Sequence, residues 1–196
     1  MTIRIGINGF GRIGRTYLRA ALAGGADVEV VAVNDLTDAG TLATLLEWDS
    51  VNGHFGGVAV EDDGLRVADR VIKVFSEPEP ARIPWGEVGA DVVIDATGFF
   101  TDREKAAEHL RGGARKVIVS APAKGDVPTF VLGVNDDRLD VSAADVFSNG
   151  SCTTNSLAPL AKVLNDVVGI ETGLMTTVHA YTGDQRLHDA PHRDLR

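Results

Sequence analysis

Cysteine is almost absent from this sequence, since Cys152 is the only one in 196 residues. A single cysteine excludes a disulfide within the chain and is typical of a protein from the reducing cytosol. One cysteine among scattered histidines gives no ligand spacing, so no metal site is predicted. A lone cysteine most often packs in the core as a small apolar residue. Whether Cys152 is such a residue or a nucleophile is not decided by the composition.

Long hydrophobic runs are missing as well. No apolar stretch reaches the roughly 18 residues of a membrane span, and the N-terminal MTIRIGINGF lacks the regions of a signal peptide. We therefore expect a cytoplasmic protein that does not bind a membrane. Basic residues are outnumbered, with 19 Lys and Arg against 28 Asp and Glu. This acidic balance argues against a nucleic-acid-binding surface.

Short runs rich in Val and Ile alternate with helical patterns. We expect strands at 2–7, 28–33, 91–96, 116–120 and 130–134, helices at 12–23, 39–48 and 102–111, hairpin strands within 53–75, and a surface loop at 77–82. Strands that alternate with helices predict βαβ crossovers and a largely parallel sheet. The predicted fold class is α/β, with a Rossmann-type, doubly wound sheet.

The character of the sequence changes after about residue 148. We expect a helix at 152–168, kinked or locally broken at Pro159, then a strand at 173–181 and a polar tail. These residues are too few to form a core of their own. We therefore divide the chain into a dinucleotide-binding domain at 1–150 and the incomplete first part of an α+β domain at 151–196, and expect a longer protein.

A glycine-rich segment, GFGRIG at 9–14, matches G-x-G-x-x-G where a strand passes into a helix. Gly9 and Gly11 permit a tight turn and close approach of a pyrophosphate, toward which the amides of Arg12 and Ile13 point. Asp35 ends the second strand, where an acidic side chain binds an adenosine ribose, and it favours NAD over NADP. The alternative is a glycine-rich turn with a surface aspartate, which the order of these features disfavours.

Two hydroxyl residues follow later strands of the predicted sheet. Thr97 comes after the strand at 91–96, and Ser120 ends the strand at 116–120. Ligands of open α/β sheets bind at the carboxyl ends of strands. From the pattern alone, a role in ligand binding and an ordinary place in a loop explain Thr97 and Ser120 equally well.

Cys152 lies where the helix at 152–168 begins. The free amides and partial positive charge of a helix N-terminus lower a thiol pKa, and they could also stabilise an oxyanion on a carbonyl that Cys152 attacks. His179, in the strand expected at 173–181, is the candidate base. His109 is less suitable because we expect it on an exposed helix. From the pattern alone, two explanations are equally well supported. Cys152 and His179 are a catalytic pair, or Cys152 is a structural cysteine and His179 a strand histidine with its hydrogen bonds satisfied.

Four segments resemble the phosphorylating glyceraldehyde-3-phosphate dehydrogenases of bacterial type: NGFGRIGR (8–15), VNDLTD (33–38), SNGSCTTNSLAPLAKV (148–163) and TTVHAYTGDQR (176–186). The resemblance covers the whole chain. It implies NAD-dependent oxidation and phosphorylation of D-glyceraldehyde 3-phosphate to 1,3-bisphosphoglycerate, in glycolysis or gluconeogenesis. Cys152 would carry a thiohemiacetal and then a thioester, and His179 would accept the hydroxyl proton.

The resemblance also implies roles for other residues. Ser151, Thr153 and Thr182 would bind the substrate phosphate or the attacking inorganic phosphate. The cofactor contacts would include Arg12, Ile13, Asp35 and Ser120. Leu36 is typical of NAD-using members, whereas Ala190-Pro191 combines a residue of NADP-using relatives with one of NAD-using relatives.

Members of this family are longer homotetramers, so the resemblance makes 151–196 the start of the catalytic domain. We expect the isolated 196-residue chain to be inactive, and the full-length protein to be a homo-oligomer, most simply a tetramer. Two alternatives stay open. One is a truncated, non-catalytic NAD-binding module, and the other is a relative that acts on erythrose 4-phosphate.

Overall fold

The computed structural model describes residues 2–25, 27–62 and 64–182. Its centre is an eight-stranded sheet in the order β10-β9-β8-β1-β2-β7-β6-β5. The parallel strands are β1 (Ile3–Asn8), β2 (Val28–Asn34), β7 (Arg70–Phe75), β8 (Val92–Asp95), β9 (Lys116–Val119) and β10 (Val146–Ser148). Two strands, β5 (Val58–Glu61) and β6 (Gly64–Val67), extend one edge in antiparallel pairing. The prediction of a Rossmann-type, mostly parallel sheet is confirmed.

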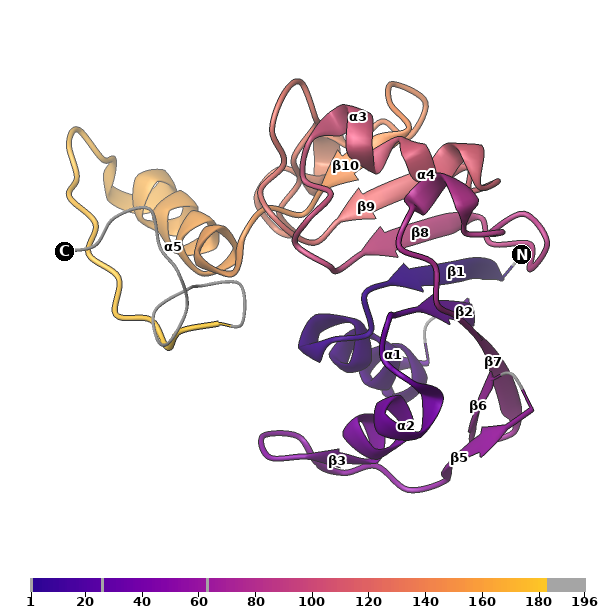
Figure 1. The fold of residues 1–196 in the computed structure, drawn as a ribbon. Coiled ribbons are helices and arrows are strands. Elements are labelled where there is room, and N and C mark those ends of the chain that lie inside the picture. The colour runs from indigo at the N-terminus through magenta and orange to yellow at the C-terminus, as the bar shows by residue number, and fades with distance from the viewer. Residues whose placement is uncertain (1, 26, 63, 183–196) are drawn as a thin grey trace, which may run out of the picture.

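Helices cover both faces of this sheet (Figure 1). Two of them, α1 (Arg12–Gly24) and α2 (Ala39–Glu47), lie on one face, and the short α3 (Arg103–Ala106) and α4 (Glu108–Arg111) lie on the other. A small hairpin of β3 (Trp48–Asp49) and β4 (Gly53–His54) follows α2, and two 3-10 turns, η1 (Pro80–Arg82) and η2 (Asp136–Arg138), lie in loops.

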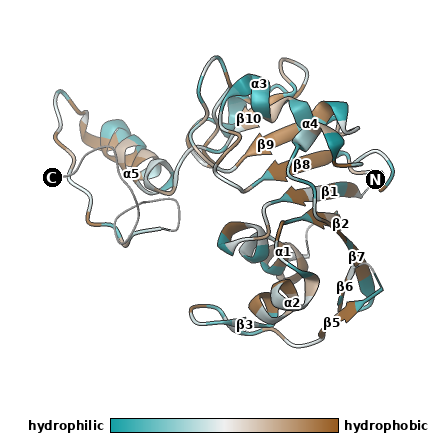
Figure 2. Ribbon diagram, in the orientation of Figure 1, coloured by the Kyte–Doolittle hydropathy of each residue, from teal (hydrophilic) through white to brown (hydrophobic). Residues whose placement is uncertain are grey.

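The central strands are apolar on both sides because each side packs against a separate core. Ile94 of β8 joins a core with Leu18 of α1 and Leu42 of α2, whereas its neighbour Val93 packs with Trp85 on the opposite face. Successive side chains of a strand point to opposite faces, so a doubly covered strand needs apolar residues at every position. The central strands are accordingly among the most hydrophobic segments of the chain (Figure 2).

Three expectations from the sequence are wrong in the part of the chain that forms the sheet and its helices. The segment 130–134 is not a strand, because the side chain of Asn135 bonds to Val131 and Thr129 and holds it in turns. The strand beside β9 is instead β10. The helix expected at 102–111 is divided into α3 and α4, and His109 of α4 is fully buried, not exposed.

The last described part of the chain has a different character. The expected helix is present as α5 (Cys152–Val168) and runs on through Pro159. None of its 17 residues is buried. The strand expected at 173–181 is wrong: these residues form no strand and are exposed. A strand requires a neighbouring strand for its backbone hydrogen bonds, and within the described residues nothing offers this segment one.

Figure 1 shows α5 beyond the carboxyl ends of the parallel strands, on the side toward which β1, β8 and β9 point. In the part of the chain that the structure covers, no helix is long and apolar enough to cross a membrane.

Candidate active site

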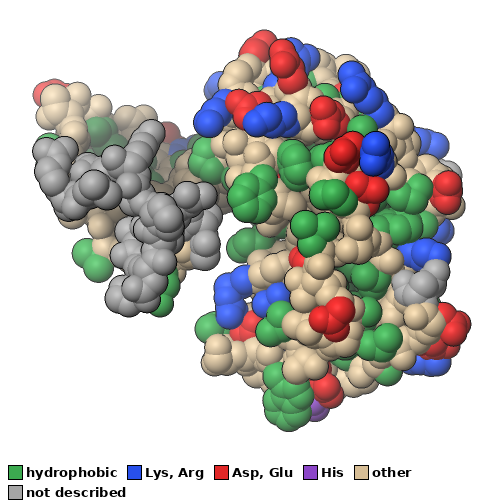
Figure 3. Space-filling view, in the orientation of Figure 1, with side chains coloured by type: hydrophobic (Ala, Val, Ile, Leu, Met, Phe, Trp, Pro, Cys, Tyr) green, Lys and Arg blue, Asp and Glu red, His purple; other side chains and the backbone are tan. Residues whose placement is uncertain are grey.

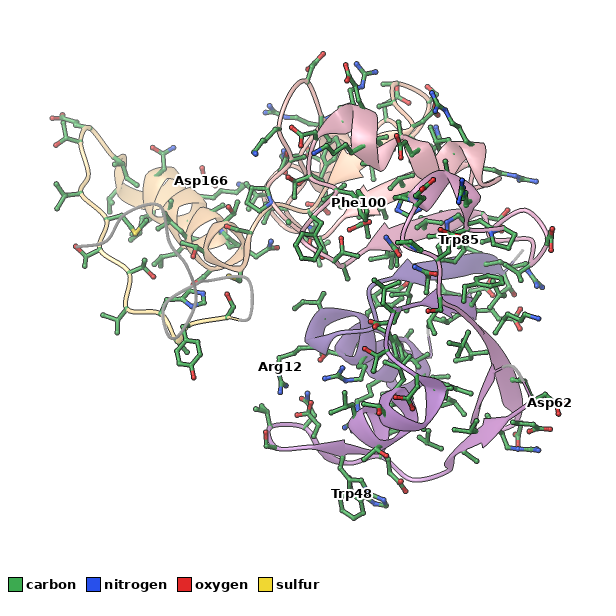
Figure 4. All side chains as sticks on the ribbon, in the orientation of Figure 1. Arg12, Trp48, Asp62, Trp85, Phe100 and Asp166 are labelled. Carbon is green, nitrogen blue, oxygen red and sulfur yellow. The ribbon has the colours of Figure 1, made fainter. Side chains whose placement is uncertain are left out.

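A cavity of about 370 Å³ lies at the carboxyl edge of the sheet. Its walls come from the glycine loop, the end of β2, the loop after β7 and the loop after β8; they comprise Asn8, Gly9, Gly11, Asn34, Asp35, Leu36, Glu77, Pro78, Ala96, Thr97, Phe99 and Phe100. Figure 3 shows hydrophobic side chains concentrated across the middle of the molecule's face. Figure 4 places Phe100 and Arg12 on the side that faces α5.

The glycine loop leaves open space where a phosphate would bind. A Cβ on Gly14 would lie 2.4 Å from the carbonyl oxygen of Gly9, so Gly14 allows α1 to pack against the loop. A Cβ on Gly11 would meet nothing within 4 Å. Gly11 is also the N-cap of α1 and provides no side-chain cap, so the first amides of the helix remain available to an anion. These features fit the pyrophosphate of a dinucleotide.

Asp35 both lines the cavity and holds the glycine loop. Its Oδ2 accepts a hydrogen bond from the amide of Phe10 at 2.8 Å, and its Oδ1 accepts one from the amide of Thr37 at 2.9 Å. Each carboxylate oxygen can accept a second bond. The carboxylate is therefore able to accept from ribose hydroxyls while it anchors the loop.

The other predicted cofactor residues divide into two groups. Thr97 lines the cavity, and its hydroxyl donates to Asp95 at 2.7 Å. The side chain of Arg12 instead pairs with Asp49 at 3.0 Å, and neither Arg12, Ile13 nor Ser120 lines the cavity. The backbone of Ser120 donates to the carbonyl of Asp95 at 2.9 Å.

The Asp49 partner of Arg12 is strongly acidic. The amides of Asn52 and Val51, followed by Arg12, lower the pKa of Asp49 to about 2. The Arg12 side chain is thus paired with an ionised carboxylate, which leaves its backbone amide, in the first turn of α1, as the group that could contact a phosphate.

Several cavity residues were not identified from the sequence. Asn8 and Asn34 end β1 and β2 and are buried beneath the cavity, while Phe99 lines its wall. The signal available for Asn8 and Asn34 was a polar residue at the end of an otherwise apolar run. Nothing in the local sequence distinguishes Phe99 from an ordinary loop residue.

Cys152 is the first residue of α5, and it is exposed. Its Sγ lies 3.1 Å from Nε2 of His179. The hydrogen bond between Cys152 and His179 is the main influence that lowers the pKa of the Cys152 thiol; partial burial opposes it, and the amide of Thr153 lowers the pKa further. The helix N-terminus and the imidazole thus both favour the thiolate.

His179 is oriented by its own neighbour in the chain. Its Nδ1 is hydrogen-bonded to the carbonyl oxygen of Ala180. A carbonyl can only accept, so Nδ1 carries the proton and Nε2 is the nitrogen that exchanges a proton with Cys152. This is the arrangement of a nucleophile with an adjacent general base.

Two of the hydroxyl residues predicted for phosphate, Ser151 and Thr153, lie at the same helix N-terminus. Ser151 is the N-cap of α5, and its Oγ accepts from the amide of Thr154 at 2.9 Å. Thr153 is half-buried in the first turn. Thr182 follows His179 by three residues and is exposed.

Ala190 and Pro191 lie outside the described residues. Among the described residues there is no cluster of three potential metal ligands.

Comparison with known proteins identifies two family models in the chain. The model described as the NAD binding domain of glyceraldehyde 3-phosphate dehydrogenase matches residues 3–103. The model described as the C-terminal domain of the same enzyme matches residues 151–196.

Curated relatives align over the whole chain. Glyceraldehyde-3-phosphate dehydrogenase 1 of Streptomyces avermitilis is 58% identical over 197 residues, which is 100% of this chain and 59% of the relative. The corresponding enzyme of Geobacillus stearothermophilus is 57% identical, and glyceraldehyde-3-phosphate dehydrogenase 1 of Bacillus subtilis is 55% identical, each covered over 58% of its length. The chain therefore spans just under three fifths of the length of these relatives.

Proposed function

Because the chain belongs to the glyceraldehyde-3-phosphate dehydrogenase family, we propose that it serves the NAD-dependent oxidation and phosphorylation of D-glyceraldehyde 3-phosphate to 1,3-bisphosphoglycerate. The observation that carries this proposal is the 3.1 Å contact between Sγ of Cys152 and Nε2 of His179 at the N-terminus of α5. A thiolate next to a base at a helix N-terminus is suited to attack on a carbonyl carbon.

In the first half of the reaction, the Cys152 thiolate attacks the aldehyde carbon and forms a C–S bond. The amides of the first turn of α5 stabilise the charge that develops on the carbonyl oxygen. That oxygen then takes from Nε2 of His179 the proton that came from the Cys152 thiol, which gives a thiohemiacetal. Nε2 of His179 then removes the hydroxyl proton as the C–H bond breaks. Bound NAD would supply the acceptor for the hydride.

The second half regenerates the cysteine. Loss of the proton and the hydride leaves a thioester on Cys152. An oxygen of inorganic phosphate attacks the thioester carbon, the C–S bond breaks, and the Cys152 thiolate departs with the electron pair. A low thiol pKa helps this step as well, because a more stable thiolate is a better leaving group.

The proposal assigns the other predicted residues to binding. Gly9 and Gly11, with the amides of Arg12 and Ile13, would hold the pyrophosphate, and Asp35 would hold the adenosine ribose. Thr97 and Ser120, at the carboxyl ends of β8 and β9, are the remaining cofactor contacts that we propose. The hydroxyls of Ser151, Thr153 and Thr182 would bind the phosphate groups near Cys152.

The covalent thioester gives the most direct test. The full-length protein is mixed with NAD and D-glyceraldehyde 3-phosphate in the absence of inorganic phosphate, and intact mass and NADH absorbance are recorded. We expect the mass of one 3-phosphoglyceroyl group on Cys152, with NADH formed in the same amount, and release of the group when phosphate is added. Cys152→Ser should give neither signal. An adduct on another residue, or NADH without an adduct, would contradict the proposal.

A further inference from the structure

A network of buried polar side chains lies directly beneath the cavity. It comprises Asn8, Asn34, Trp85, Asp95 and His109, all of which are at least 96% buried, with His109 and Trp85 completely so. Asn8, Asn34 and Asp95 are the last residues of β1, β2 and β8. Burying polar groups is costly unless each finds a partner, so this cluster requires an explanation that the proposed chemistry does not give.

The proton on His109 has only one possible position. Nε1 of Trp85 donates to Nδ1 of His109 at 3.0 Å. An indole nitrogen can only donate, so Nδ1 must accept and the ring proton lies on Nε2. Nε2 is 3.0 Å from Oδ2 of Asp95 and donates to it. His109 is thus a neutral imidazole that connects Trp85 to the buried carboxylate.

Asp95 is fully satisfied by donors from two directions. Its Oδ2 accepts from Nε2 of His109 and from Nδ2 of Asn8, the latter at 2.8 Å. Its Oδ1 accepts from the amide and the hydroxyl of Thr97, at 3.1 and 2.7 Å. The carboxylate therefore fixes the turn at Thr97, which forms one wall of the cavity.

The same network reaches the opposite wall through two asparagines. Oδ1 of Asn8 accepts from Nδ2 of Asn34 at 2.8 Å. Asn34 in turn bonds both backbone groups of Glu77: its Nδ2 donates to the carbonyl oxygen at 2.9 Å, and its Oδ1 accepts from the amide at 2.9 Å. An unbroken chain of hydrogen bonds, buried at its centre and partly buried at both ends, thus joins Thr97 to Glu77 across the floor of the cavity.

We propose that His109 is a positioning residue for the dinucleotide: it holds Asp95, and through Asp95 the Thr97 and Glu77 walls, at the separation that the bound nucleotide needs. This inference rests on the proposed NAD-binding function. Without the His109 ring, the buried carboxylate loses the Nε2–H donor and the indole N–H of Trp85 loses its acceptor Nδ1, and both losses are costly in a buried site. The network relaxes, and the walls lose their fixed spacing.

The test compares three variants of the full chain by titration calorimetry with NAD. His109→Leu removes both hydrogen bonds, whereas His109→Gln retains a donor and an acceptor on a side chain of similar reach. Val117→Ala is the control for lost stability, because Val117 is completely buried in a separate core cluster and its side chain makes none of the hydrogen bonds of the network. We expect the Kd for NAD to rise about tenfold in His109→Leu, the equivalent of one lost buried hydrogen bond, and to remain near the wild-type value in the other two.

A second measurement does not depend on NAD. The amides of Thr97 and Glu77 both donate into the network, so hydrogen exchange at these two amides should accelerate together in His109→Leu and not in Val117→Ala. If His109→Leu does not fold, nitrogen NMR of the wild-type protein still tests the arrangement, since Nδ1 of His109 should be unprotonated and Nε2 protonated.

The outcomes separate this inference from the proposed function. A wild-type protein that does not bind NAD contradicts the proposed function, while coupled exchange at Thr97 and Glu77 would still support the network. A His109→Leu variant with wild-type affinity and wild-type exchange overturns the inference and leaves the proposed function intact. A protonated Nδ1 on His109 overturns it as well.

Discussion

At the scale of single residues, the reactivity that we propose for this site would come from two side chains and one helix terminus. Cys152 gains from His179 a hydrogen bond that lowers its pKa. His179 gains its orientation from the carbonyl of Ala180. None of these groups is unusual by itself, and the proposal is that their contact would make the thiol a nucleophile at neutral pH.

The pH dependence of alkylation tests this coupling. Because the pKa of Cys152 is lowered, its thiolate is present at a lower pH than in an ordinary cysteine, and iodoacetamide should react rapidly near pH 7. In His179→Asn, the main cause of the shift is removed, so the rate profile should move to higher pH. Turnover in the full-length enzyme should fall by about a hundredfold or more, because the general base is lost. An unchanged profile in His179→Asn would disprove the coupling.

Asp35 provides a second prediction at this scale. The 2′-phosphate of NADP would lie near the ribose-binding carboxylate and be repelled by it, so we expect NADP to bind about tenfold or more weakly than NAD. In Asp35→Ala, the ratio of the two Kd values should shift toward NADP, although both affinities fall because the amides of Phe10 and Thr37 lose their acceptor. Asp35→Asn is the control, since it removes the charge and keeps an acceptor. Equal catalytic efficiency with both cofactors would contradict this argument.

At the scale of elements, the first βαβ unit combines a rigid loop with an open helix N-terminus. Phe10 is held on both sides, because its amide donates to Asp35 and its carbonyl accepts from Arg15 at 2.8 Å. Gly14 lets α1 pack closely on this loop, and Gly11 leaves the space in front of the helix empty. Two glycines three residues apart thus serve packing and binding separately.

Alanine substitutions should separate these two roles. Gly14→Ala places a methyl group 2.4 Å from the carbonyl oxygen of Gly9, so we expect a loss of about 1–3 kcal/mol in the free energy of unfolding. Gly11→Ala meets no protein atom within 4 Å and should change stability by less than about 0.5 kcal/mol. It should nevertheless weaken NAD binding about tenfold or more, because the methyl group occupies the phosphate position. Urea unfolding and calorimetry would measure the pair, and a wild-type NAD affinity in Gly11→Ala would contradict the assignment.

At the scale of the whole molecule, the two halves differ in how well they are packed. The sheet and its helices bury three core clusters. By contrast, α5 exposes an apolar surface that includes Leu160, Val163, Val167 and Val168, and residues 169–182 are exposed throughout. The Cys152–His179 pair therefore lies in the part of the described chain that has the least packing around it.

We accordingly expect the 196-residue chain to bind NAD and to show little turnover. A catalytic pair in an exposed segment lacks the exclusion of water and the fixed geometry that catalysis requires. A coupled NADH assay, with intact mass measured on the same sample, would test this expectation. High specific activity from a species of the 196-residue mass would contradict it.

The segments predicted correctly are those whose local signals were strong. Strands β1, β2, β8 and β9 are long apolar runs bordered by turn residues, and α1 follows the glycine loop. The strand β10 has only three residues, too few to show a pattern, and it exists because β9 offers a free edge. The segment 173–181 has an apolar pattern, but the described residues offer it no neighbouring strand to pair with, so the pattern predicted a strand that the structure does not have.

The sequence by itself determined the kind of sheet, the position of the glycine loop and the start of α5, because glycine spacing, apolar periodicity and helix capping act between residues close in the chain. Only the tertiary structure decided which distant polar groups meet. Asn8 is hydrogen-bonded to Asp95, which lies 87 positions later in the chain. His109, which we expected at the surface, is buried and hydrogen-bonded to both Trp85 and Asp95. Such contacts depend on how the crossovers stack the strands, and a buried polar group is stable only where that stacking supplies its partner.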